Sequence, residues 1–142
     1  MRAHGSFDLW VDNQVLMARI SGAWNEEGGW RYFKALKQIS QPIIAKPWAL
    51  LVSIDEWELG TPETDRAALA MLEWVTQHGV VRMAEIYSPN ILLQLEVARM
   101  GKKIPFEIEQ RHFSDEDTAF KWLVSQGFPV QLAQLKNRQP QS

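Results

Sequence analysis

The sequence contains no cysteine among its 142 residues, so disulfide frameworks, thiolate nucleophiles and cysteine-based metal sites are excluded. It has no apolar run approaching the roughly 20 residues of a membrane-spanning helix. Its first residues lack the apolar segment of a secretion signal. No charge of one sign dominates, because the formal net charge is −2 with acids and bases mixed along the chain, which disfavours nucleic acid as a partner. These absences predict a cytoplasmic protein with no transmembrane segment.

Length and composition suit one packed domain. The 142 residues are 46% hydrophobic and 23% charged, which is enough apolar surface for a core and enough polar surface for solubility. We expect residues 1–128 to form a single α/β domain and residues 129–142 to form a partly flexible C-terminal extension.

Apolar and polar residues follow one another in patterns that predict five strands. The first two alternate on either side of Asp12 and Asn13 and should form an opening β-hairpin. The strand that starts at Trp48 is apolar almost throughout, as expected of a central strand buried on both faces. The last alternates so regularly that we expect an edge strand. The predicted strands cover about residues 6–11, 15–20, 48–54, 80–87 and 106–111.

Apolar residues at helical spacing, preceded by capping residues or prolines, predict four helices. Asn25 is expected to cap the first, Thr61 the second and Ser114 the last, while residues 55–60 should form a loop. Because helices alternate with strands after the hairpin, those strands should pair in parallel. The predicted fold class is α/β, with a mixed, mostly parallel five-stranded sheet, an N-terminal β-hairpin and about four helices. The predicted helices cover about residues 25–40, 61–78, 90–100 and 114–126.

This element order and three local patterns resemble the SpoIIAA-like superfamily, which includes the STAS domains of anti-sigma factor antagonists. The patterns are the hairpin end Ile20-Ser21-Gly22, the strand Leu50-Leu51-Val52-Ser53-Ile54 with its following loop and helix, and the run from Phe113 to Leu123. The last is most similar to the uncharacterised STAS-like branch. The resemblance covers roughly residues 6–128. It implies the SpoIIAA-like fold and a regulatory or protein-interaction role.

The phosphorylation switch of antagonist-type members does not carry over. In those proteins an Asp-Ser pair follows the central strand, and its serine is phosphorylated to break a partner complex. The matching region here, residues 58–64, has no such pair. Thr61 lies near the phosphorylated position, but we expect its hydroxyl to cap the helix, and Glu58, Glu63 and Asp65 would repel a phosphate.

Few residues suggest catalysis. The three histidines, His4, His78 and His112, lack metal-ligand spacing, so we interpret them as surface or capping residues. We predict no catalytic residue, no metal site and no cofactor. The densest polar group surrounds Trp57 and could do acid–base chemistry or hold a divalent cation, although such acids also serve the helix dipole and keep a loop solvated. Its members are Asp55, Glu56, Glu58, Glu63 and Asp65.

Seven tryptophans are present, and most should be core residues, including Trp30, which shares helical spacing with Phe33. Trp24 and Trp57 are different, because both lie in predicted loops that open on one edge of the sheet. An aromatic-lined pocket or a docking patch is expected there. The predicted ligand- or partner-binding residues are Trp24, Asp55, Trp57, Thr61, Tyr87 and Ser88.

The third predicted helix has apolar residues on two nearly opposite faces, only one of which the sheet can cover. We expect the face of Leu93, Val97 and Met100 to meet a partner, most simply as a homodimer seam. A C-terminal tail that folds back as a lid remains an equal alternative.

The leading hypothesis is a non-enzymatic regulatory or interaction module that docks a protein partner through the strand-end loops and a neighbouring helix. The alternative is a carrier of a small apolar ligand or lipid, with the aromatic residues lining a pocket. A hydrolase that uses Asp55, Glu58, Glu63 and Asp65 ranks last.

Overall fold

The computed structural model describes residues 5–58, 64–87 and 108–130. The described strands form one sheet in the order β1-β2-β3-β4-β5. The first pair is antiparallel and the other neighbours are parallel, which confirms the predicted mixed, mostly parallel sheet. Its strands are β1 (Ser6–Asp12), β2 (Val15–Ala23), β3 (Trp48–Glu58), β4 (Val80–Tyr87) and β5 (Glu109–Phe113).

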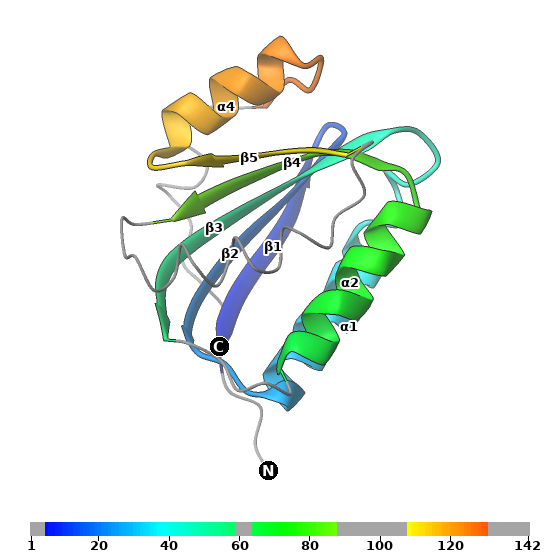
Figure 1. Cartoon of the computed structure of the whole chain (residues 1–142). Helices are drawn as coiled ribbons and strands as arrows, with labels where there is room; N and C mark the ends of the chain where they lie inside the picture. The colour runs from blue at the N-terminus through cyan, green and yellow to red at the C-terminus, as the bar shows by residue number, and fades with distance from the viewer. Residues whose placement is uncertain (1–4, 59–63, 88–107, 131–142) are drawn as a thin grey trace.

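Helices cover both faces of this sheet. Two of them, α1 (Glu26–Ile39) and α2 (Thr64–Gln77), lie side by side on one face, and α4 (Glu116–Ser125) lies on the other (Figure 1). The described residues therefore hold three helices rather than about four. The helix predicted over residues 90–100 lies outside them, together with Leu93, Val97 and Met100.

The central strand β3 holds the two halves of the core together. Leu50 is fully buried on the side of α1 and α2, where it joins Leu36 and Val75. Leu51 is fully buried on the opposite side, with Phe120 of α4. Burial of each such side chain contributes about 1.5–3 kcal/mol. Because Leu50 and Leu51 are buried on opposite faces, the prediction of a central strand buried on both faces is confirmed.

The starts of α1 and α4 show the predicted capping chemistry, with one correction at α4. Asn25 caps α1, because its side-chain oxygen accepts a hydrogen bond from the Gly28 amide at 2.9 Å. The cap of α4 is Asp115 rather than Ser114: its carboxylate accepts from the backbone amide and the hydroxyl of Thr118, at 2.8 and 2.7 Å. A carboxylate that satisfies two donors outcompetes the neighbouring hydroxyl for this position.

Strand boundaries differ from prediction in β2, β3 and β5. A register shift after Ile20 lets β2 and β3 continue in parallel, with Gly22 beside Trp57. The strand β3 therefore runs to Glu58, and residues 55–58 are not the loop that their acidic composition predicted. The strand β5 begins at Glu109, about three residues later than predicted. Among the described strands it pairs with β4 alone, as predicted for an edge strand.

Candidate functional site

The sheet register brings the carboxyl-terminal ends of β2, β3 and β4 together at the same end of the sheet. Ile54 of β3 pairs with Tyr87, the last residue of β4. Gly22 of β2 pairs with Trp57. Asp55 also lies in this end of β3. The backbone therefore brings three predicted site residues, Asp55, Trp57 and Tyr87, to the same end of the sheet.

For most of the predicted site residues the structure describes no side chain. Thr61 and Ser88 lie outside the described residues, and so do the side chains of Asp55, Trp57 and Tyr87. The acidic group that a hydrolase would use is likewise not described at side-chain level. These assignments stay predictions.

Trp24 follows β2 in a loop, as predicted, but it is only 6% exposed. Its ring lies 6.1 Å from that of Phe7 and 5.6 Å from that of Tyr32, and its indole nitrogen donates to the Ser21 carbonyl at 2.9 Å. We call Phe7, Trp24 and Tyr32 the aromatic cluster. Trp24 thus offers little surface to a docking protein, although it could contact a molecule bound inside the domain.

The Tyr32 hydroxyl, at the inner side of α1, is buried and has no hydrogen-bond partner. Burial raises the pKa of Tyr32, and the negative charge of Glu85 raises it further. The phenol therefore stays protonated and holds a donor that nothing accepts. Buried polar atoms in folded proteins nearly always have a partner, so this hydroxyl needs an explanation.

Glu85, Gln110 and His112 form a polar group on neighbouring strands, which we call the β4–β5 triad. Glu85 is 9% exposed and pairs in register with His112. One Glu85 oxygen accepts a hydrogen bond from Gln110, and the other lies 3.5 Å from His112 Nε2. The hydrogen bond to Glu85 raises the pKa of His112, against the opposing effect of burial. The interaction with Glu85 therefore favours the protonated form of His112.

The triad was not foreseen from the sequence. Its members come from strands more than 20 residues apart, and sequence patterns do not give the register of two parallel strands. The interpretation of His112 as a surface residue fits its exposure, but the sequence did not indicate its pairing with a buried carboxylate. The one available signal was Glu85 itself, a charged residue inside the apolar run of β4.

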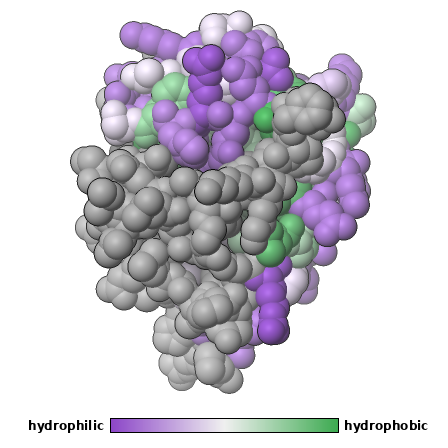
Figure 2. All heavy atoms as spheres, in the orientation of Figure 1, coloured by the Kyte–Doolittle hydropathy of each residue, from purple (hydrophilic) through white to green (hydrophobic). Residues whose placement is uncertain are grey.

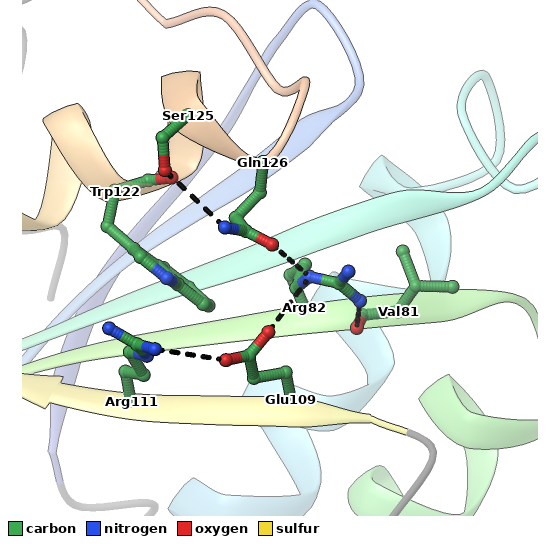
Figure 3. Close-up of polar contacts among 7 residues, drawn as sticks. All are labelled: Val81, Arg82, Glu109, Arg111, Trp122, Ser125 and Gln126. Atoms are coloured by element: carbon green, nitrogen blue, oxygen red, sulfur yellow. Dashed lines mark hydrogen bonds and ion pairs between the residues drawn. The ribbon is translucent and has the colours of Figure 1, made fainter.

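A second polar network lies on the opposite face and joins β4 and β5 to α4 (Figure 3). Arg82 donates to Gln126 at 2.9 Å and lies 3.5 Å from Glu109. Glu109 also pairs with Arg111 at 3.3 Å, and the Arg111 guanidinium lies 5.6 Å from the centre of the Trp122 ring. These partly exposed contacts hold the edge strand against α4, and each is worth little by itself.

The outer surface of α1 carries an exposed tryptophan. Trp30 is 40% exposed, and among the described residues only Trp30 and Val124 are large hydrophobic residues that remain exposed. Arg31 and Lys34, on the same helix, are exposed too. The prediction that Trp30 is a core residue is wrong, because the buried positions of α1 include Gly29, Phe33 and Leu36. Trp30 is about 100° around the helix from Gly29 and falls at the edge of that stripe.

The described part of the chain holds neither a candidate metal-binding group nor a membrane-spanning helix. Its residues include no group of three or more histidine, aspartate or glutamate side chains placed to hold a metal ion. None of its helices is long and apolar enough to cross a membrane. Its visible surface is mainly hydrophilic, with only small hydrophobic areas (Figure 2).

Comparisons with known proteins agree with the observed topology. No protein-family model matches the sequence, and no curated protein sequence matches it. Among solved structures, the chain is similar to an uncharacterised protein of the DUF3478 family from Shewanella loihica PV-4, which has a SpoIIAA-like fold. The match has a TM-score of 0.67 and 16% sequence identity, and it covers 87% of this chain and 98% of the other. An antiparallel opening pair, parallel strands and helices on both faces, together with this match, establish that the chain has the SpoIIAA-like fold.

Proposed function

We propose that this protein is a non-enzymatic regulatory module that docks a protein partner on the outer surface of α1. The observation that supports the proposal is Trp30, which remains 40% exposed on a helix whose other large apolar residues turn inward. Tryptophan is strongly enriched among the residues that dominate protein–protein binding energy. Its indole nitrogen lies 3.4 Å from a Glu26 oxygen, which orients the ring at the surface.

The charges beside Trp30 indicate the chemistry of the partner. Arg31 and Lys34 are exposed on α1, and Lys37 lies 4.5 Å from the centre of the Phe33 ring. Glu26 and Glu27 precede Trp30 on α1, so the basic charge lies on its C-terminal side. A partner segment with an apolar residue beside a carboxylate would complement that side. Because rim charges mainly affect association rate, binding should weaken as salt increases.

A photo-cross-linking amino acid at position 30 tests the proposal in the source cells. Val124, on the opposite face of the sheet, is 51% exposed and is the matched control position. We expect a cross-linked product of defined mass from position 30 and none from position 124. A product of twice the chain mass would identify a second copy as the partner. Equal labelling at both positions, or none, would contradict a docking surface on α1.

A carrier of a small apolar ligand is the second candidate. The observation that favours it is the Tyr32 hydroxyl, buried beside the aromatic cluster without a partner. Ligand sites typically combine apolar and aromatic walls with a few polar groups that fix orientation. Native mass spectrometry of the gently purified protein tests this candidate, because a carrier should retain a small molecule that denaturation releases.

A further inference from the structure

The Tyr32 hydroxyl and the Glu85 carboxylate lie on the same face of the sheet. Tyr32 packs on Phe7 with ring centres 5.6 Å apart. Phe7 pairs with Ile20 of β2, and Ile20 pairs with Ile54 of β3, so their side chains point to the same face. Glu85 pairs with Val52, the next residue of β3 that points to that face. Both Val52 and Ile54 belong to the core beneath α1 and α2.

The Tyr32 hydroxyl and the Glu85 carboxylate differ in the hydrogen bond that each could make with a bound group. The hydroxyl has a proton and no acceptor in the structure. The carboxylate has two oxygens, each already facing one donor, and each oxygen can accept another hydrogen bond. A group that accepts from Tyr32 and donates to Glu85 would satisfy both.

We propose that Tyr32 and Glu85 bind the head group of an apolar molecule that ends in a neutral hydroxyl, that is, an alcohol. This assignment rests on the carrier function and names the ligand class of that site. The aromatic cluster and the apolar residues Val52 and Ile54 of β3 would contact the hydrocarbon part, where apolar burial supplies affinity.

Other head groups fit these residues less well. A carboxylate would be repelled by the negative charge of Glu85. An ammonium group has no lone pair, so it would leave the Tyr32 proton without an acceptor. Where His112 is protonated, its positive charge would also repel the ammonium group. A hydroxyl oxygen donates once and accepts twice, so an alcohol has both the acceptor that Tyr32 lacks and a donor for Glu85.

Three ten-carbon probes that differ only in the head group test the assignment: 1-decanol, decanoate and decylammonium. Binding to the full-length protein can be measured by ligand-observed NMR and calorimetry at neutral pH. We expect 1-decanol to bind most tightly, and Tyr32→Phe to weaken it about tenfold, the effect of roughly one buried hydrogen bond. That substitution retains the ring that packs on Phe7 and Trp24.

Ser40→Ala is the matched control, because it also removes a buried hydroxyl, but one that donates to the Lys37 carbonyl at 3.2 Å. We expect this variant to melt at a lower temperature and to bind 1-decanol as the wild type does. Tyr32→Phe, by contrast, should raise the melting temperature of the ligand-free protein, because it removes a polar atom without a partner. A fall like that of Ser40→Ala would show that water already satisfies the hydroxyl, which would overturn the assignment.

The outcomes separate this assignment from the function on which it rests. If no probe binds and native mass spectra show no retained molecule, the carrier function fails and the assignment fails with it. If all three probes bind equally, or if 1-decanol binds Tyr32→Phe as tightly as wild type, the carrier function stands and the Tyr32–Glu85 head-group site is refuted.

Discussion

Replacement of Gly5 by alanine should destabilise the protein through two separable effects. Gly5 has a φ of +108°, and a Cβ there would overlap the ring of Trp24. Forcing a non-glycine residue into such a backbone conformation costs about 1–3 kcal/mol. Overlap with a packed ring adds about 1–3 kcal/mol, as in other overpacked sites. The total expected loss is therefore about 2–6 kcal/mol.

Gly127 provides the control for the backbone effect alone. Its φ is +90°, and a Cβ there would meet nothing within 4 Å. The free energy of unfolding from urea titration should thus fall less for Gly127→Ala than for Gly5→Ala. In a Trp24→Leu background, the cost of Gly5→Ala should approach that of Gly127→Ala. Equal losses for the two alanine variants in the wild-type background would refute the packing of Trp24 on Gly5, and with it the geometry of the aromatic cluster.

Two further predictions concern the triad and α4. Because the hydrogen bond to Glu85 raises the pKa of His112 above its usual 6.5, the stabilisation that His112 supplies should be complete below that value and disappear as the pH rises through the raised pKa. Urea titrations of wild type and His112→Gln at several pH values check this, and a difference that grows with pH would contradict it. Phe120→Ala should cost about 3–5 kcal/mol, because Phe120 is fully buried. Val124→Ala, on the exposed side of the same helix, should stay within about 0.5 kcal/mol in thermal and urea unfolding, and similar losses for both would contradict the orientation of α4.

The fold could be predicted largely because its signals are local. The hairpin turn, the Asn25 cap and the apolar run from Trp48 each depend on a few adjacent residues, and the resemblance to the SpoIIAA-like superfamily rested on the same local patterns. The errors in the predicted fold arose where a residue far away in the sequence determines the local structure. Pairing of Gly22 with Trp57 extended β3 through the acidic residues 55–58, although charge composition predicted a loop there.

The candidate site was harder to predict, for the same reason. Trp24 was selected as a loop residue, and its position after β2 was correct, but its burial depends on contacts with Phe7 and Tyr32. The pairing of Glu85 with His112 depends on strand register. Trp30 was assigned to the core because its spacing from Phe33 fits a helix face, yet only the packing of α1 decides which side of that face is covered.

The helix α1 connects the two proposals, and this connection can be tested. Trp30 and Tyr32 are two residues apart, so they lie about 200° apart around the helix, one facing outward and the other inward. An alcohol at Tyr32 can change partner binding only if it binds more tightly to one position of α1 than to another. We expect 1-decanol to alter the affinity for the partner, seen as a changed yield of cross-linking from position 30, and the partner to alter the affinity for 1-decanol by the same factor as its own affinity changes. The wild-type yield at saturating 1-decanol should differ from that of Tyr32→Phe at the same concentration. An identical yield with and without the alcohol, in a protein shown to bind both, would mean that the two sides of α1 act independently.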